Sequence, residues 1–240
     1  MVIGAIFAGG VGRRMGSADM PKQYLKLGTK PIIVHTIEKF AVNPGIDSIV
    51  VLCPKAWIAH TKDLIKKYLG EKTPKDIYVV EGGSTRNGTL ENALRFISEN
   101  FDIDDDSVIV THDAVRPFLT HRIICENIEA ARKYGACDTV IPATDTIVHS
   151  ADSENVSDIP TRSELYQGQT PQSFRIKELE SVLASLTDEE KNTLTDACKI
   201  YTIKNKPVRM VDGEVFNVKI TYAYDLKVAN ALLGVVDDDK

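Results

Sequence analysis

Short apolar runs alternate with amphipathic stretches along most of this chain. The apolar runs are rich in β-branched residues and predict buried strands at 2–7, 49–53, 77–80, 108–110 and 138–142. Between them, apolar residues recur at helical spacing and predict helices at about 31–41, 57–69, 84–100 and 121–134. Continuous apolar strands separated by amphipathic helices are typical of a parallel sheet covered on both faces. We therefore predict an α/β fold with a mostly parallel, twisted sheet.

The pattern changes between residues 144 and 174. Two short β-like runs, 146–149 and 165–167, flank a polar, acidic turn at 152–158. Such a segment is too long for an ordinary loop. A disordered insertion is the alternative, which the alternating flanks disfavour. We predict a β-arm over about 144–174 that projects from a single domain of residues 1–240.

Composition and charge narrow the class of protein. The chain has 240 residues, of which 43% are hydrophobic and 26% charged, as in an ordinary globular domain. The net charge of −5 argues against a non-specific nucleic-acid binder. Its four cysteines form no CxxC pair, so neither a disulfide framework nor a zinc site is indicated. Without a signal-peptide pattern or a membrane-length apolar run, we expect a soluble, cytoplasmic protein.

A glycine-rich loop, Ala8-Gly9-Gly10-Val11-Gly12-Arg13-Arg14, follows the first predicted strand, and Lys22 comes shortly after it. Glycines let several backbone N–H groups converge on one point, and the cations would complement a polyphosphate. The loop fits neither the GxxxxGK[ST] pattern nor the dinucleotide GxGxxG pattern. A turn that binds nothing is the alternative, which leaves the clustered cations unexplained.

Two further polar clusters follow predicted strands. The stretch Gly82-Gly83-Ser84-Thr85-Arg86-Asn87-Gly88-Thr89 opens a helix, and its small residues would let a nucleobase lie against the backbone. In 111–117, Asp113 stands where a Mg²⁺ ligand is expected, with a turn cap as the alternative. Ligands of parallel sheets bind at the carboxyl ends of the strands. We therefore expect the loops 8–16, 82–89, 111–117 and 142–146 to share one edge.

Taken in order, these motifs resemble the cytidylyltransferases of sugar-alcohol phosphates. The resemblance covers nearly the whole chain and rests on AGGxGxRM, PKQY, GGSTR, HDAVRPF, Asp145-Thr146, QTPQSF, Thr195-Asp196 and Asn217-Val218-Lys219. It implies a Rossmann-like fold of the nucleotide-diphospho-sugar transferase type. One branch is 2-C-methyl-D-erythritol 4-phosphate cytidylyltransferase of isoprenoid synthesis. The other is ribitol-5-phosphate cytidylyltransferase, which makes CDP-ribitol for teichoic-acid-type wall polymers.

Several details favour the ribitol branch. The first loop has Gly9 where the erythritol enzymes usually have alanine, and it includes the extra pair Gly16-Ser17. Thr111 precedes His112, and Ala197-Cys198 replaces the usual residues after Thr195-Asp196. Phe216 stands where many erythritol enzymes have an acid, so a second protein ligand for a metal is not expected from that loop.

The resemblance implies the following roles. CTP would contact Ala8, Gly9, Gly10, Gly12, Gly82, Gly83, Ser84, Arg86, Thr89, His112 and Asp113. Asp113 would help to hold Mg²⁺, while Arg14 and Lys22 stabilise charge on the α-phosphate and the leaving group. Lys219 and Arg162 would hold the acceptor phosphate, with Asp145, Thr146 and Thr170 near the acceptor hydroxyls. The β-arm would embrace a second subunit in a homodimer, so that Arg162 serves the partner's site. The alternative outside enzymology is a nucleotide-binding regulatory protein.

Overall fold

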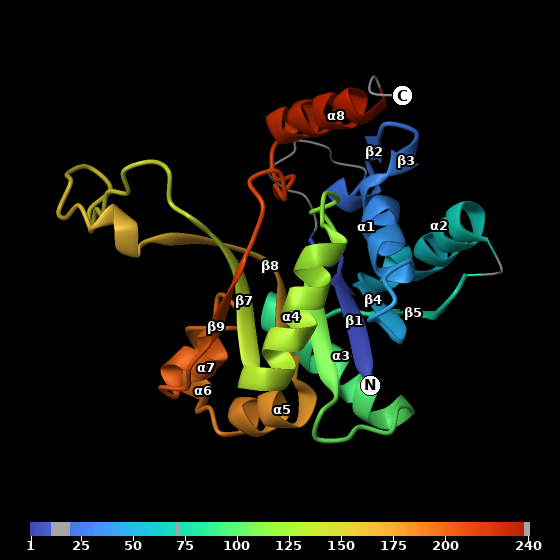
Figure 1. Ribbon diagram of the computed structural model, residues 1–240, viewed down its shortest axis with the longest axis horizontal. Helices are drawn as coiled ribbons and strands as arrows, with labels where there is room; N and C mark the ends of the chain where they lie inside the picture. The colour runs from blue at the N-terminus through green and yellow to red at the C-terminus, as the bar shows by residue number, and fades with distance from the viewer. Residues whose placement is uncertain (11–19, 71–72, 238–240) are drawn as a thin grey trace.

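A computed structural model describes residues 1–10, 20–70 and 73–237. Its centre is a seven-stranded sheet in the order β5-β4-β1-β6-β8-β7-β9, with a two-stranded ribbon, β2 and β3, beside it (Figure 1). The strands are β1 (Val2–Phe7), β2 (Lys26–Leu27), β3 (Lys30–Pro31), β4 (Ser48–Cys53), β5 (Asp76–Glu81), β6 (Val108–Asp113), β7 (Ala136–Pro142), β8 (Tyr166–Arg175) and β9 (Arg209–Asp212).

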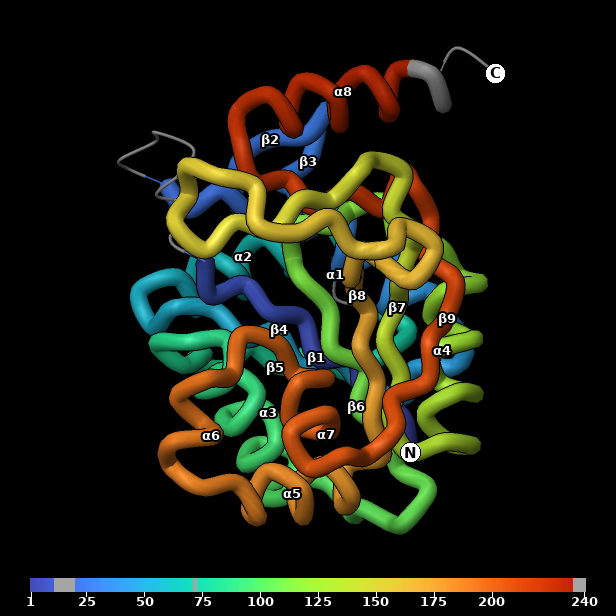
Figure 2. The backbone as a smooth tube through the Cα atoms, turned by 90° about the vertical axis from the view of Figure 1, so that its left-hand side faces the viewer, coloured from blue at the N-terminus to red at the C-terminus, as the bar shows by residue number. Residues whose placement is uncertain are grey.

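Helices cover both faces of the sheet, as the sequence predicts. The α-helices are α1 (Ile32–Ala41), α2 (Ile58–Leu69), α3 (Arg86–Asn100), α4 (His121–Tyr134), α5 (Ile176–Ala184), α6 (Asp188–Asn192), α7 (Lys199–Ile203) and α8 (Ala223–Asp237). Short 3-10 helices span Lys22–Tyr24, Lys55–Trp57 and Arg162–Glu164. One apolar cluster joins the sheet to α1, α2 and α4, and a second joins it to α3, α5 and α7. Figure 2 shows α3 and α4 on opposite sides of the sheet.

The first strand is the centre of this arrangement. All six residues of β1 are buried, and the strand pairs in parallel with β4 on one side and β6 on the other. A Cβ atom at Gly4 would lie 2.9 Å from Cε1 of Phe40, so this glycine lets α1 pack closely on the strand. Both neighbours are fully buried and contain continuous apolar runs, 49–53 in β4 and 108–110 in β6, which is why the pattern of the sequence predicts this half of the fold well.

β8 is the main correction to the predicted fold. The sequence analysis assigns 165–167 to one side of a β-arm and expects no strand at 168–175. In the structure, β8 inserts between β6 and β7 and is antiparallel to both. Residues 169–174 are buried, so the arm ends at about residue 166 and not at 174. The strand is polar and contains Pro171, which hides it from patterns based on apolar runs.

The remaining part of the predicted arm does project from the domain (Figure 1). It is held by few regular contacts. The run at 146–149 forms only an isolated bridge, between His149 and Asp158, instead of a strand. Asp152 organises the tip, because its carboxylate accepts hydrogen bonds from the backbone N–H groups of Glu154 and Asn155 at 2.9 and 2.8 Å.

The C-terminal helix was not predicted, and it closes one end of the molecule. Ala229 of α8 joins a small buried cluster with Leu27 of β2, Ile32 of α1, Val115 and Ile220. Figures 1 and 2 both place α8 against β2 and β3. This packing brings the segment before α8, which carries Lys219, back to the carboxyl end of β6. None of the described helices is long and apolar enough to cross a membrane.

Candidate active site

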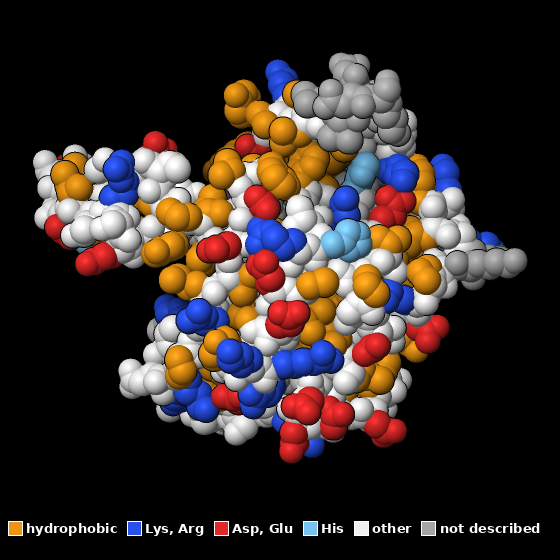
Figure 3. Space-filling view, in the orientation of Figure 1, with side chains coloured by type: hydrophobic (Ala, Val, Ile, Leu, Met, Phe, Trp, Pro, Cys, Tyr) orange, Lys and Arg blue, Asp and Glu red, His pale blue; other side chains and the backbone are white. Residues whose placement is uncertain are grey.

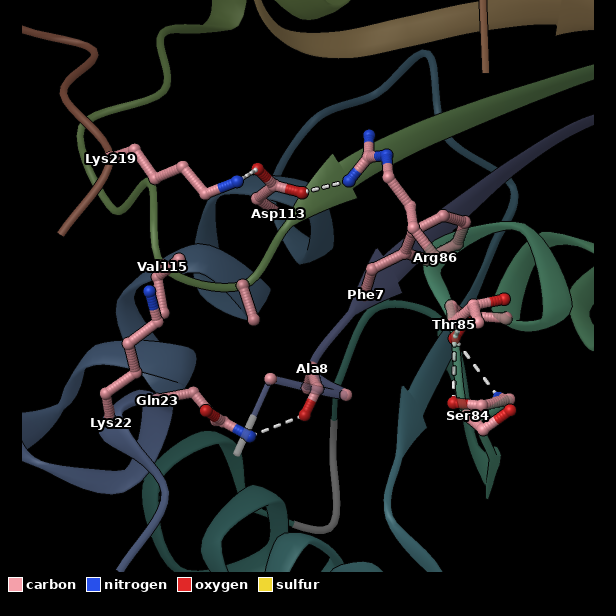
Figure 4. Close-up of a pocket in the computed structure, with 15 residues that line it drawn as sticks. Phe7, Ala8, Lys22, Gln23, Ser84, Thr85, Arg86, Asp113, Val115 and Lys219 are labelled. Carbon is pink, nitrogen blue, oxygen red and sulfur yellow. Dashed lines mark hydrogen bonds and ion pairs between the residues drawn. The ribbon is translucent and has the colours of Figure 1, made fainter. Parts of the chain in front are cut away.

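A pocket of about 350 Å³ opens at the carboxyl ends of β1 and β6, beside the start of α3 (Figure 4). The residues that line it are Phe7, Ala8, Gly9, Gly10, Lys22, Gln23, Gly83, Ser84, Thr85, Arg86, Thr89, Asp113, Ala114, Val115 and Lys219. Parts of three loops that the sequence predicts to lie together, 8–16, 82–89 and 111–117, therefore meet here. The fourth predicted loop, 142–146, contributes none of the described lining residues. It follows β7 and leads into the arm.

Asp113 is surrounded by cations at the floor of the pocket. One carboxylate oxygen, Oδ1, accepts a hydrogen bond from Nη1 of Arg86. The other, Oδ2, lies 2.9 Å from Nζ of Lys219 and 3.8 Å from Nε of Arg116. Burial alone would raise the pKa of Asp113, but the charges of Arg86 and Lys219 outweigh it and hold the pKa well below its usual range. The carboxylate therefore stays ionised at any physiological pH.

Arg86 comes from the first turn of α3. Thr85 caps this helix by accepting a hydrogen bond from the N–H of Gly88 at 3.0 Å. The Arg86 guanidinium lies 5.4 Å from the ring centroid of Phe7, a cation–π contact. Burial would lower the pKa of Arg86, but Asp113 more than compensates and the net shift is upward.

The turn before α3 is closed by Thr89. Its hydroxyl accepts a hydrogen bond from the N–H of Gly83 at 3.1 Å and donates to the carbonyl of Thr85 at 2.8 Å. A Cβ at Gly83 would lie 2.6 Å from the backbone N of Thr89 and closer still to Gly88. Only glycine therefore fits at position 83. Gly82 precedes the turn and does not line the pocket.

The first loop enters the pocket with its backbone exposed. Ala8, Gly9 and Gly10 line one wall, and the carbonyl of Ala8 accepts a hydrogen bond from Nε2 of Gln23. Lys22 is 8% exposed, and its ammonium group donates to the carbonyl of Ile220 at 2.9 Å, next to Lys219 in the chain. The predicted site residues Gly12 and Arg14 lie outside the described residues, as does the Gly16-Ser17 pair.

His112 and Thr170 lie behind the pocket and not in it. The pKa of His112 is lowered to about 4, chiefly by burial, so the ring is neutral. Its Nε2 donates to the carbonyl of Arg116 at 3.0 Å, which leaves Nδ1 to accept from the Thr170 hydroxyl at 2.9 Å. Thr170 in turn accepts from the N–H of Asp113 at 3.2 Å. The two buried side chains thus orient Asp113, and the predicted contacts of His112 with CTP and of Thr170 with an acceptor are not available to them in this arrangement.

The structure places Asp145, Thr146 and Arg162 on the arm. All three are exposed, and none lines the pocket of the same chain. Nη1 of Arg162 donates to the carbonyl of Thr144 at 3.3 Å, which ties it to the root of the arm. Any contact of these residues with a substrate would therefore require a different chain or a movement of the arm.

Two groups of the described residues could be considered as metal ligands. Asp113 is ionised and faces the pocket, which fits a Mg²⁺ ion that takes one carboxylate from the protein and most of its other ligands from phosphates and water. Asp138, Asp196 and Cys198 have ligand atoms within 4.8 Å of one another, but they lie behind Arg86. Nε2 of Gln172 already donates to both of these carboxylates, so the group is satisfied without an ion.

Gln23 and Gln172 are site residues that the sequence analysis did not single out. Gln23 lies within the PKQY motif and Gln172 within QTPQSF. The sequence analysis identifies both motifs but assigns no role to these two side chains. A polar side chain within a buried strand is the signal that could have identified Gln172, had β8 been predicted.

Comparison with known proteins gives a consistent result. The sequence model of the family described as IspD, 2-C-methyl-D-erythritol 4-phosphate cytidylyltransferase, matches residues 2–235. Among solved structures, the 4-diphosphocytidyl-2C-methyl-D-erythritol synthase of Anaerococcus prevotii is 29% identical with a TM-score of 0.78, over 97% of this chain and 96% of that one. The 2-C-methyl-D-erythritol 4-phosphate cytidylyltransferase of Francisella tularensis is 27% identical with a TM-score of 0.76, over 96% and 99% of the two chains.

Proposed function

Because this chain belongs to the 2-C-methyl-D-erythritol 4-phosphate cytidylyltransferase family, and is therefore a CTP-dependent nucleotidyltransferase, we propose that its pocket transfers the cytidylyl group of CTP to a polyol phosphate. The observation that carries this proposal is the charge of the pocket. Among the described lining residues, the three cations Lys22, Arg86 and Lys219 outnumber the single carboxylate, Asp113. Such an excess of cations beside two glycine-rich loops complements a triphosphate.

The reaction needs little covalent chemistry from the protein. An oxygen of the acceptor phosphate attacks the α-phosphorus of CTP, a new P–O bond forms, and the bond to the β-phosphate breaks. Pyrophosphate leaves with the bonding electron pair. Lys22 and Arg14 stabilise the charge on the α-phosphate and the leaving group, and Lys219 holds the acceptor phosphate. Positioning and electrostatics supply nearly all of such catalysis.

The glycine loops accommodate the nucleotide. The backbone of Ala8, Gly9, Gly10 and Gly12 receives the triphosphate, and the turn from Gly82 to Thr89 receives the base. Asp113 would hold Mg²⁺. When bound, the ion would neutralise negative charge on the phosphate oxygens and so weaken their repulsion of the attacking anion. Lys219 and Arg86 are then free to exchange their contact with Asp113 for one with a phosphate.

Two acceptors have support from different observations. The comparisons back 2-C-methyl-D-erythritol 4-phosphate better than ribitol 5-phosphate, because the matched family and the matched structures carry the erythritol name. Ribitol 5-phosphate is the second candidate, and the residues Thr111, Ala197 and Cys198 support it. Gly9 discriminates poorly between the two acceptors. A Cβ at this position would lie 3.7 Å from Oγ1 of Thr89, an ordinary contact, so the alanine usual in the erythritol enzymes would also fit here.

We also propose that two chains form a dimer through the arm, with Arg162 completing the partner's site. The arm presents the exposed apolar side chains Ile147, Val148, Val156 and Ile159, and Figure 3 shows hydrophobic side chains along it. Apolar groups gathered on a projecting segment are typical of an interface. Asp145 and Thr146, at the root of the arm, would contact acceptor hydroxyls in that assembly.

The experiment is a pyrophosphate-release assay with CTP, Mg²⁺ and each acceptor in parallel. We expect turnover with one acceptor and none with CTP alone. Lys22→Ala should reduce turnover by about 10²-fold, since loss of one such donor costs roughly 3 kcal/mol, while the exposed Lys26→Ala should not change it. Tight CTP binding without release with either acceptor would favour the regulatory alternative.

A further inference from the structure

The side chain of Gln172 on β8 lies behind the pocket and is hydrogen-bonded at both ends. It is 1% exposed. Its Nε2 donates to Oδ1 of Asp138 at 3.0 Å and to both carboxylate oxygens of Asp196 at 2.8 Å. Its Oε1 accepts a hydrogen bond from Nη2 of Arg86 at 3.2 Å. One amide therefore joins two half-buried carboxyl groups to an arginine of the pocket.

The partners of this amide fix its orientation. Ionised carboxylates only accept hydrogen bonds, and a guanidinium only donates them. A rotation of the amide by 180° would direct its oxygen at Asp138 and Asp196 and its N–H groups at Arg86. Every one of these contacts would then become repulsive, so a single orientation satisfies both ends.

Arg86 depends on this amide for its own orientation. In the described part of the chain its Nε is buried and has no hydrogen-bond partner. The guanidinium is attached to Asp113 through Nη1 and to Gln172 through Nη2. Two attachments on different nitrogens define the plane of the group, whereas one would leave it free to rotate. Figure 4 shows Arg86 and Lys219 directed at Asp113 from opposite sides.

We propose that Gln172 is a positioning residue of the active site, which fixes the Arg86 guanidinium and couples it to the half-buried carboxyl pair Asp138 and Asp196. The inference rests on the proposed function, because the orientation of Arg86 affects turnover only if a nucleotide enters this pocket. Gln172 itself does not line the pocket and touches no substrate there.

The charges around the amide make the proposal testable by pH. The titratable groups that face it are Arg86 of α3, Asp113 of β6, Asp138 of β7, and Asp196 and Cys198 before α7. A third carboxyl group at position 172 would lie against Asp138 and Asp196 and would keep its proton to unusually high pH. While protonated, its O–H can donate to the carboxyl pair and its other oxygen can accept from Arg86.

The experiment compares Gln172→Glu with the wild-type protein from pH 6 to pH 9. We expect the ratio of their kcat/KM values for CTP to fall by about tenfold or more as the pH rises. Once ionised, the introduced carboxylate can no longer donate to Asp138 and Asp196 and is repelled by them, so it leaves its place and no longer fixes the plane of the Arg86 guanidinium. Gln172→Met should lower the ratio by a constant factor at every pH. Gln167→Glu, an exposed position on the same strand, adds the same charge and should leave the ratio at one. Thermal unfolding of each variant confirms that it is folded.

A double variant that conserves charge provides a second test. In Gln172→Glu/Asp196→Asn the donor moves to residue 196 and the acceptor to residue 172, so we expect activity at high pH to be regained. A pH-independent ratio for Gln172→Glu, or a wild-type rate for Gln172→Met, would overturn the proposal. If the wild-type protein binds CTP without turnover, the proposed function fails, and the CTP Kd of the same variants by calorimetry then decides on Gln172. If it binds no CTP, both proposals are rejected.

Discussion

Two carboxyl groups, the buried Asp113 and the half-buried Asp138, have opposite pKa shifts, and their neighbours explain why. Asp113 contacts Arg86 and Lys219, so its pKa lies below the usual range although it is buried. Burial raises the pKa of Asp138 to about 6, and the charge of Asp196 adds to the shift, although hydrogen bonds from Gln172 and Cys198 and the charge of Arg86 act against it. The same residue type thus provides a permanent anion on β6 and a titrating group on β7.

The raised pKa of Asp138 predicts a pH-dependent stability. A carboxyl group that binds its proton more tightly in the folded state stabilises that state at low pH, and the contribution is lost as the pH rises to about 6 and beyond. Between pH 5 and pH 8 the loss is about 1 kcal/mol, or about 2–4 °C in Tm for a chain of this length. Asp138→Asn keeps an acceptor for Gln172 and should remove this loss.

Differential scanning calorimetry at pH 5 and pH 8 checks this prediction. The difference in Tm between Asp138→Asn and the wild-type protein should be more positive at pH 8 than at pH 5. Asp76→Asn, at an exposed residue of β5, is the matched control and should give the same difference at both values. An equal difference for Asp138→Asn at both values would contradict the pKa assignment.

Among the elements, the turn that opens α3 has the strictest requirement on its sequence. The chain folds back so closely that Gly83 touches the backbone of Gly88 and Thr89. This contact places Ser84, Thr85 and Arg86 at the wall of the pocket. The first loop makes a looser approach, because Gly9 has room for a Cβ.

Alanine substitutions at these two glycines should therefore have different effects on stability. Gly83→Ala must move the backbone at Gly88 and Thr89, so we expect the free energy of unfolding to fall by about 1–3 kcal/mol, as in other overpacked sites. Gly9→Ala should change it by less than about 0.5 kcal/mol. Urea unfolding of both variants measures the contrast, and similar stabilities would show that the turn is less tightly closed than the structure indicates.

At the scale of the whole molecule, the site depends on segments far apart in the sequence. The segment before α8 returns across the pocket, where the N–H of Ile220 donates to the carbonyl of Val115 at 2.9 Å. This places Lys219 on Asp113. The arm projects from the domain (Figure 1), and it carries Arg162, which is exposed and does not line the pocket of its own chain.

The exposed apolar side chains of the arm indicate that two chains pair through it, and we predict that activity depends on this pairing. Val148→Asp/Ile159→Asp should convert a dimer into a monomer, because it places two charges on the apolar surface of the arm. Val42→Asp, at an equally exposed valine beyond the end of α1, is the control. Sedimentation equilibrium measures the state of each. A wild-type protein that is monomeric at all concentrations would contradict the prediction.

Mixing two inactive variants tests whether Arg162 acts on the partner. Arg162→Ala and Lys22→Ala each disable a different part of the site. In a mixed dimer, the site with an intact Lys22 would receive Arg162 from the Lys22→Ala subunit, so part of the activity should return. No recovery after subunit exchange would show that Arg162 does not act between chains.

The sequence by itself determined the parallel half of the sheet and the loops that follow it. β1, β4 and the first half of β6 are continuous apolar runs because both of their faces are covered, and such runs are visible without any contact being known. The edge strand β5 has a similar apolar run, although it is only half-buried. The glycines at positions 9, 10 and 83 and the cations Lys22 and Arg86 were found in the same way, since tight turns and phosphate sites favour few residue types. Lys219 came only from the resemblance to a known family.

Only the tertiary structure decided which polar residues are buried and which distant groups form hydrogen bonds with them. β8 lies between two strands and has its polar side chains satisfied by Asp138, Arg86 and other distant residues, so its local pattern does not identify it. For the same reason it decided that His112 and Thr170 are buried behind the pocket and hydrogen-bonded to each other, and that Arg162 lies on the arm and does not line the pocket of its own chain. Apolar burial is recorded in local periodicity, whereas a hydrogen-bond partner far along the chain is not.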